Sequence, residues 1–491
     1  MDLHKIFLTL VLPWLVTATT AETPACIIRI TTKGLEFVKQ EGLKFVEQEL
    51  ENLTIPNLSG SKGRFHYSIS NVTVTDLQLA LSNLLFQPEQ NFVFDINNAS
   101  ISLSFQRKLL YWLFYDTGMI NASAEGVFIK TELRMAKDLA GRLKIDNMTC
   151  KASIAKMQAD FGGTLRTVYG FLGSVLTTGM RFLLSQQICP LLRHAGLVLL
   201  NSVLDTVPVR NALDKYIGID YSLLSDPDVT EDSLDMQFKG MFFYLKNEND
   251  TLPNLAVSPV IKEHERMVYI GLSEYFFDSA MYAYYKADVL KINITEEKMP
   301  KNLEVLLRTT YFGSIMLLKP EVASAPLLLE FQVSIPPRFI IKPLSTTASA
   351  TATLDIYLMP TDLPPEQLTS MTMELKFGAR VFVKGKNLQV YLDLKRFRMY
   401  SNHSPLESFA LIPLQTPLKT LLQLMVMPVI NERTKRGVEI PLPEGMEFTK
   451  ETVTNHTGFV VVEGDLHFSV SLRDVIEKYR AAPSPKPTLS D

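Results

Sequence analysis

The sequence predicts an α+β protein with two tandem domains. The chain has 491 residues, of which about 470 remain without the leader described below. That exceeds the roughly 250–300 residues at which a single hydrophobic core stops growing. Apolar and polar residues alternate in several segments of both halves, which is typical of half-buried strands. An order of helix, strands and helix occurs twice, about 200 residues apart, and this repetition predicts two related domains.

Residues 1–21 have the pattern of a secretory signal peptide. Lys5 supplies the basic region, Ile6–Val16 the apolar region, and Thr19-Thr20-Ala21 the small residues before cleavage. The apolar region is too short to span a bilayer. The signal predicts a secreted protein, and ten N-x-Ser/Thr acceptors predict that it is glycosylated. The candidate asparagines are Asn52, Asn57, Asn71, Asn98, Asn121, Asn147, Asn249, Asn293, Asn402 and Asn455.

The composition argues against two classes of partner. The formal net charge is −3, and 21% of the residues are charged. This balance does not suit a nucleic-acid-binding protein or a strongly cationic membrane-disrupting protein. Hydrophobic residues make up 46% of the chain, and the mean hydropathy of +0.10 is high for a secreted protein. We therefore expect apolar surface to be hidden in the fold or covered by a greasy ligand.

The first half predicts a helix followed by an antiparallel meander. Residues 33–53 have apolar residues at three- and four-residue spacing, and Pro56 is expected to stop this helix. Residues 64–155 contain turn residues at intervals of about ten. Alternation within them is clear in Phe65–Val74 and in Asn91–Phe105.

Residues 157–204 return to helical spacing. Polar residues such as Arg181 interrupt this segment too often for a membrane span, and Pro190 is expected to break it. The segment therefore predicts a long helix that packs on a sheet or borders a lipid cavity, in a protein that is not integral to a membrane.

The second half repeats the pattern after a boundary expected within residues 205–260. The predicted division is 22–240 for the first domain, 241–262 for a proline-containing linker, 263–480 for the second domain and 481–491 for a disordered tail. The predicted elements are a helix capped by Ser273 and running to about Lys286, a helix at Leu303–Leu307, strands at Leu327–Ser334, Ala348–Leu358, Met371–Val383 and Leu388–Tyr400, a helix at about Leu418–Arg433, a strand at Gly458–Val470 and a short helix at Ser471–Arg480.

Three cysteines remain after cleavage: Cys26, Cys150 and Cys189. In an oxidising compartment, one disulfide and one free thiol is the simplest arrangement. Cys150 and Cys189 make the better pair, because Cys26 lies close to the mature N-terminus. No CxxC or HxxxH spacing supports a metal site.

No catalytic motif is present. The chain lacks G-x-S-x-G, H-E-x-x-H, a P-loop and G-x-G-x-x-G, so no catalytic residue and no cofactor is predicted. Catalytic triads can assemble from distant residues, and a secreted lipid-modifying enzyme stays an alternative to a binding protein. Two basic groups, Lys395-Arg396-Phe397-Arg398 and Arg433-Thr434-Lys435-Arg436, could meet lipid headgroups or sulfated sugars. Their more ordinary interpretation is a solvated strand end and a solvated helix end.

An unusually aromatic run, Leu109-Leu110-Tyr111-Trp112-Leu113-Phe114-Tyr115, follows Arg107-Lys108. Taken alone, it is either a buried strand with alternate residues inside or a surface that contacts lipid. The turn-like Asp116-Thr117-Gly118 and the sequon at Asn121 favour the surface, because sugar acceptors must face solvent.

Several motifs resemble one family of lipid-binding plasma proteins. These motifs include Cys26-Ile27-Ile28-Arg29-Ile30-Thr31, Leu110-Tyr111-Trp112-Leu113-Phe114-Tyr115-Asp116, Gln187-Ile188-Cys189-Pro190, Ser273-Glu274-Tyr275-Phe276-Phe277-Asp278 and Ile440-Pro441-Leu442-Pro443-Glu444-Gly445. The resemblance covers essentially the whole mature chain. The family includes lipopolysaccharide-binding protein, bactericidal/permeability-increasing protein and cholesteryl ester transfer protein, and the motifs are most similar to its phospholipid-carrying branch.

The resemblance implies a boomerang of two barrel-like domains joined by a central sheet, with a disulfide between Cys150 and Cys189. It implies an extracellular carrier that moves phospholipid between lipoproteins or membranes and remodels high-density lipoprotein. The alternative is a lipopolysaccharide-binding protein of innate immunity with the same fold, although the N-terminal half lacks a dense basic cluster.

The resemblance also supports two separate sites. Tyr111, Trp112, Leu113, Phe114 and Tyr115 are expected to dock the protein on a lipid surface, where Trp and Tyr suit the interface. The candidates for the pocket that holds the transported lipid are Val175, Leu176, Gly179, Met180, Leu183, Phe276, Leu306 and Leu307. Read from spacing alone, each of these eight is more often an ordinary core residue.

Overall fold

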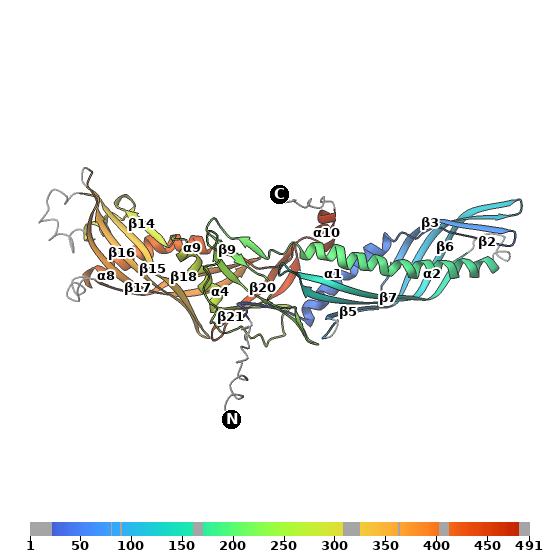
Figure 1. The fold of residues 1–491 in the computed structure, drawn as a ribbon, viewed down its shortest axis with the longest axis horizontal. Coiled ribbons are helices and arrows are strands. Elements are labelled where there is room, and N and C mark those ends of the chain that lie inside the picture. The colour runs from blue at the N-terminus through green and yellow to red at the C-terminus, as the bar shows by residue number, and fades with distance from the viewer. Residues whose placement is uncertain are drawn as a thin grey trace, which may run out of the picture.

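The computed structural model describes residues 22–79, 81–88, 91–160, 170–307, 325–361, 364–401 and 412–480. The molecule is elongated, with a curled sheet at each end and a further sheet across the middle (Figure 1). This arrangement confirms the predicted α+β architecture of two barrel-like halves joined by a central sheet. The division of the chain at residues 241–262 stays a prediction.

The N-terminal sheet has the strand order β2-β3-β5-β6-β7, and β4 pairs with β5. Its strands are β2 (Leu58–Lys62), β3 (Phe65–Gln78), β4 (Leu81–Gln87), β5 (Asn91–Tyr111), β6 (Phe114–Lys137) and β7 (Leu143–Asp160). All pairings are antiparallel, as the meander predicted. Residues 157–160 end β7, so the expectation that the long helix begins at residue 157 is wrong.

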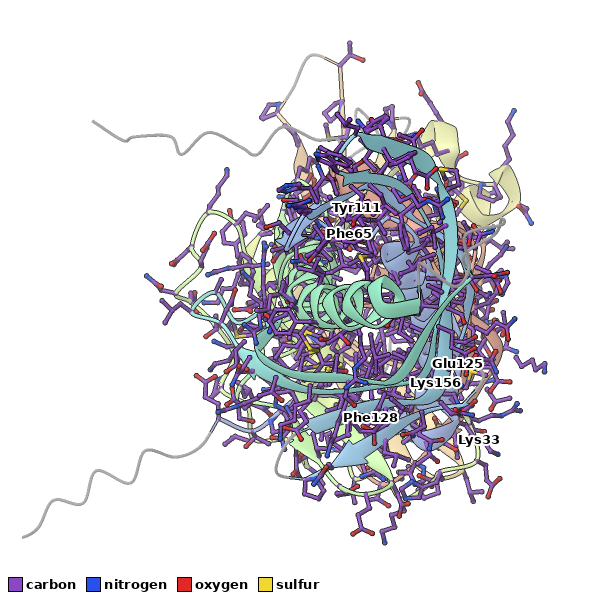
Figure 2. All side chains as sticks on the ribbon, turned by 90° about the vertical axis from the view of Figure 1, so that its right-hand side faces the viewer. Lys33, Phe65, Tyr111, Glu125, Phe128 and Lys156 are labelled. Atoms are coloured by element: carbon purple, nitrogen blue, oxygen red, sulfur yellow. A yellow bond between two sulfur atoms is a disulfide. The ribbon has the colours of Figure 1, made fainter. Side chains whose placement is uncertain are left out.

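Helices fill the concave side of this sheet. They are α1 (Thr32–Glu51), α2 (Gly170–His194), the π-helical segment η1 (Ala195–Leu200) and α3 (Asn201–Leu204). Viewed along the long axis, the strands wrap around α2 (Figure 2). Pro190 lies inside α2, so the predicted break is wrong. The carbonyl group that a proline deprives of its donor belongs to the residue four positions earlier. Here that residue is Gln186, which is exposed and can bond water.

By length and composition, Thr177–Leu204 could cross a membrane. The apolar core helix of a soluble protein has the same properties. This segment is fastened to the sheet by polar groups, because Arg181 Nη1 donates to the Ala155 carbonyl at 3.2 Å and Asn201 bonds to Ile145.

The C-terminal sheet has the order β14-β15-β16-β17-β18-β19. Its strands are β14 (Lys291–Thr295), β15 (Leu327–Lys342), β16 (Ser345–Leu358), β17 (Glu366–Lys384), β18 (Asn387–Ser401) and β19 (Val438–Glu439). The helical elements are α4 (Glu274–Lys286), η2 (Glu296–Lys298), α5 (Lys301–Leu307), α8 (Ile412–Leu421), the π-helical η4 (Leu422–Val426) and α9 (Met427–Thr434). The predicted strands are therefore confirmed, and most are longer than expected. The start of α4 is also confirmed, but the Ser273 hydroxyl makes no cap hydrogen bond.

The central sheet joins the two halves in the order β10-β11-β1-β13-β21-β20. Its strands are β10 (Asp228–Val229), β11 (Ser233–Phe238), β1 (Cys26–Thr31), β13 (Val268–Ser273), β21 (Phe459–Phe468) and β20 (Met446–Asn455). A smaller sheet contains β12 (Met241–Tyr244), β9 (Ile217–Asp220) and β8 (Arg210–Ala212). The first strand of the described chain thus pairs directly with a strand from the second half.

The last helix, α10 (Leu472–Arg480), returns to the first half. Its Val475 and Ile476 are buried in one cluster with Phe45, Leu199 and Val203 of the helices that fill the N-terminal sheet. Both ends of the described chain therefore fasten one half of the molecule to the other.

Candidate functional site

The aromatic run forms the tip of the β5–β6 hairpin, at one end of the long axis (Figure 1). Tyr111 pairs with Phe114 across a loop of two residues, Trp112 and Leu113. The exposed fractions of residues 111 to 115 are 42, 68, 80, 75 and 66%. Leu109 alone of the run is buried. A strand with alternate residues inside would bury about half of these side chains, so the run is mainly a surface feature.

Trp112 has a backbone conformation that is unusual for a bulky residue. Its φ is 53°, and a single positive φ at the first loop position is typical of a type II′ hairpin turn, where glycine is the usual residue. A large side chain in this region is strained, and the exposed indole gains no core packing in return. Strain at a solvent-facing aromatic residue suggests a functional role.

The neighbouring β2–β3 hairpin contacts the tip. Phe65, the first residue of β3, stacks on Tyr111 with the ring centroids 4.0 Å apart (Figure 2). On the inner face, the guanidinium of Arg107 forms an ion pair with Asp116 at 3.1 Å. That guanidinium lies over Gly118, where an added Cβ would be 3.3 Å from Nη2. This ion pair links β5 to β6 just below the apolar end.

The interior of the N-terminal half is lined by one stripe of α2. Met180, Leu184, Ile188 and Leu192 follow one another at four-residue spacing, and at most 3% of each is exposed. They share an apolar cluster with Ile101, Leu103 and Phe105 of β5. The buried stripe thus faces the concave side of the sheet.

The candidates predicted from the sequence include part of this stripe. Met180 belongs to it, Leu183 is half-buried beside it, and Gly179 lies against Leu58 of β2. The side chains of Val175 and Leu176 lie outside the described part of the structure. The prediction missed Leu184, Ile188 and Leu192, although their repeated four-residue spacing was a readable signal.

Of the three pocket candidates from the second half, the structure describes the side chain of Phe276. Phe276 of α4 is buried in the central core, edge-on to Phe242 and Phe277 with centroids 5.1 and 5.4 Å apart. The side chains of Leu306 and Leu307 lie outside the described part of the structure. A hollow of about 360 Å³ beside α4 has a largely polar lining that includes Lys286, Asp288 and Gln332. That lining does not suit an acyl chain.

The predicted disulfide is confirmed. Cys150 of β7 and Cys189 of α2 have their Cα atoms 5.5 Å apart and are bonded, so the bridge fastens the lining helix to an edge strand. Cys26 is a free, buried thiol, and burial raises its pKa to about 12. Within the described ranges, no group of three or more His, Cys, Asp or Glu side chains could hold a metal ion.

The sequons agree with a glycosylated surface. Eight of the ten candidate asparagines are exposed, which leaves their side chains open to modification: Asn52, Asn57, Asn71, Asn98, Asn121, Asn147, Asn249 and Asn293. Asn455 is half-buried. Asn402 lies outside the described residues.

Comparison with known proteins identifies the family. The N-terminal domain model of the LBP / BPI / CETP family matches residues 34–207, and its C-terminal domain model matches residues 211–468. The chain belongs to the LBP / BPI / CETP family. Within that family it is similar to the human protein named phospholipid transfer protein, with 58% identity over 94% of each chain. The mouse protein of the same name is 56% identical over the same shares.

The fold agrees with a solved member of the LBP / BPI / CETP family. A crystal structure of lipopolysaccharide binding protein matches with a TM-score of 0.62 and 20% identity, covering 91% of this chain and all of that one. At this identity the match speaks for the fold alone.

Proposed function

We propose that this chain is a secreted carrier that binds phospholipid and moves it, chemically unchanged, between lipoprotein particles or membranes. The observation that carries the proposal is the 58% identity, over 94% of the chain, to a human protein named phospholipid transfer protein. Human lipopolysaccharide-binding protein is only 23% identical. Exchange of phospholipid between lipoproteins would remodel high-density lipoprotein.

Uptake of lipid rests on the interior of the N-terminal half. Each buried CH₂ of an acyl chain contributes about 0.8 kcal/mol, so two chains supply ample affinity without a polar contact. The apolar stripe through Met180 and Leu184 offers the surface that such chains require.

Attachment to the lipid surface rests on the β5–β6 tip. The side chains of Trp112 and Phe114 are exposed, aromatic and uncharged. Burying both in a headgroup region contributes a few kcal/mol, enough for reversible attachment. Trp112 is the only tryptophan left once the signal peptide is removed, so its fluorescence should shift to the blue when phosphatidylcholine vesicles are added. Transfer without such a shift would contradict docking through this tip.

The two sites can be separated by mutation. Trp112→Ala with Phe114→Ala should weaken vesicle binding and leave the lipid content of the purified protein unchanged. Met180→Gln puts a polar group among buried apolar residues and should reduce lipid content, whereas Met359→Gln, at a more exposed methionine, should not. Equal effects of the Met180 and Met359 variants would contradict a pocket at Met180.

The substrate is tested by mass spectrometry of lipid extracted from the purified protein, combined with transfer between donor and acceptor vesicles. Bound diacyl phospholipid and unchanged transferred lipid support the proposal. Bound lipid A would favour the lipopolysaccharide-binding alternative, and a chemically altered product would favour an enzyme.

A further inference from the structure

The outer face of the C-terminal sheet carries a concentration of positive charge. Five exposed cations define what we call the cationic face: Lys376, Arg380 and Lys384 of β17, and Arg396 and Arg398 of β18. They alternate with residues of the core, among them Phe377 and Ala379. Since successive side chains of a strand point to opposite sides, the five cations point away from the core.

In the described part of the chain, these cations form no ion pairs. Within the described parts of the chain, none of the five has a carboxylate within 4.0 Å, in contrast to the adjacent Lys395, which pairs with Asp393 at 2.6 Å. Lys376 lies directly opposite Arg396 in the β17–β18 ladder. Like charges in directly opposed positions destabilise a sheet. A chain with a net charge of −3 therefore gathers cations here at a cost to its own stability, which points to an anionic partner.

Exposed aromatic residues lie among the cations. Phe382 of β17 and Tyr391 and Tyr400 of β18 are 40, 42 and 39% exposed. The guanidinium carbon of Arg380 is 5.0 Å from the centroid of the Tyr391 ring. The acidic residues of this part of the two strands are Asp393 and Glu374, which lies directly opposite Arg398 in the ladder. The face thus combines an excess of positive charge with amphipathic rings.

We propose that the cationic face binds the headgroup layer of an anionic phospholipid surface. Phosphate and carboxylate groups of the lipid would complement the cations, and the Tyr and Phe rings suit the interface between headgroups and hydrocarbon. The charges are spread across two neighbouring strands and along both of them. That spread suits a planar layer better than a single linear polyanion.

This contact is distinct from the docking tip. The β5–β6 hairpin and the strands β17 and β18 belong to the two opposite ends of the molecule (Figure 1). The tip is apolar and should bind neutral lipid surfaces, whereas the cationic face adds a preference for negative charge. Binding to anionic surfaces should accordingly weaken as salt is added, and binding to neutral surfaces should not.

The test is co-sedimentation of the full chain with vesicles of phosphatidylcholine, alone or mixed with phosphatidylserine. The variant Lys376→Glu with Arg396→Glu should bind the anionic vesicles roughly thirtyfold more weakly or worse, the loss expected for two surface cations. Its binding to neutral vesicles should be unchanged. The control is Lys151→Glu with Lys156→Glu, the same change of charge on exposed residues of β7, and it should bind both vesicles like the parent.

Equal binding of the two double variants to anionic vesicles would overturn the proposal. Retention on a column of sulfated polysaccharide gives a second readout. If the Lys376→Glu, Arg396→Glu variant loses retention there but binds anionic vesicles like the parent, the face recognises a polysaccharide and the lipid proposal is wrong. Because phospholipid content and transfer between neutral vesicles are measured separately, failure here leaves the carrier function standing.

Discussion

Asn201 and Asn431 make the same pair of hydrogen bonds in the two halves of the molecule. Asn201 accepts from the backbone N–H of Ile145 at 2.9 Å and donates to its carbonyl at 3.0 Å. Asn431 accepts from the N–H of Leu392 at 2.8 Å and donates to its carbonyl at 2.9 Å. Each asparagine lies in the long helical region of its half, after a π-helical segment.

Among the described residues, no strand pairs with the bonded positions on that side. Ile145 belongs to β7, the last strand of the N-terminal sheet, and β18 pairs with β19 only at Asn387 and Leu388. The asparagine amide therefore stands in for the missing strand and closes the sheet against its helix. The same solution in both halves supports the internal duplication that the order of elements predicted.

Replacing Asn431 or Asn201 with alanine should destabilise the half that contains it. Each change removes the two hydrogen bonds to the strand, at about 1 kcal/mol each, so we expect a loss of about 2 kcal/mol. The loss should be larger for Asn201→Ala, which also removes the bond from Asn201 to the Leu197 carbonyl. Urea unfolding monitored by circular dichroism measures it. Asn387→Ala, at an exposed asparagine of β18, is the control, and equal shifts for Asn387→Ala and Asn431→Ala would contradict this account.

Long periodic segments made the helices and most strands predictable, including β21 of the central sheet, whereas the strands β1 and β20 of that sheet were not predicted. Strand β1 has only six residues and takes both of its neighbours from positions over 200 residues away. The sequence of strand β20 is mostly polar, so it gives little sign of a buried strand. Their pairing depends on long-range contacts that local spacing cannot reveal.

The exposed hairpin tip was easier to predict from the sequence than the buried stripe of α2. The five consecutive apolar and aromatic residues 111–115 can be recognised in the sequence itself. The turn at Trp112 and Leu113 is enough to expose them. The buried stripe of α2 was predicted in part, because many apolar residues of α2 have helical spacing and the sheet selects which of them face inward. Leu184 and Ile188 are buried because β5 and β7 curl around that side.

The thiol of Cys26 should be inert in the folded protein. Burial raises its pKa to about 12, so almost none is present as the thiolate, the form that reacts with alkylating agents. Iodoacetamide at about pH 8 should therefore label Cys26 only after unfolding. Mass spectrometry of native and urea-treated samples measures this, and labelling of the native protein would show that the central sheet opens at β1.

Asp278 should give stability an unusual pH dependence. Burial raises the pKa of its carboxyl group, although the N–H of Phe339 and the guanidinium of Arg338 donate to it at 2.7 and 3.1 Å. In the window above the ordinary aspartate pKa of about 3.9, the folded state then holds this proton more firmly than the unfolded state does. The contribution of Asp278 to stability is therefore lost as pH rises through that window.

The variant Asp278→Asn should remove this contribution. Its urea midpoint, compared with that of the parent from about pH 4 upward, should fall less steeply with rising pH. Asp232→Asn, at an exposed aspartate, should leave the profile of the parent intact. A parallel profile for Asp278→Asn would contradict the assignment.

Trp112→Gly should separate the stability of the tip from its function. Glycine adopts a positive φ without the cost of roughly 1–2 kcal/mol that other residues incur, so the folded protein should be as stable as the parent or slightly more stable. The same change deletes the largest exposed aromatic ring of the tip, so binding to phosphatidylcholine vesicles should fall. Trp112→Ala is the matched comparison, because it removes the ring and keeps the strain. Both variants should lose vesicle binding alike, and Trp112→Gly should have the higher urea midpoint. If Trp112→Gly instead lowers the midpoint, the indole stabilises the hairpin through contacts with its neighbours, and its exposure is not the reason for its position.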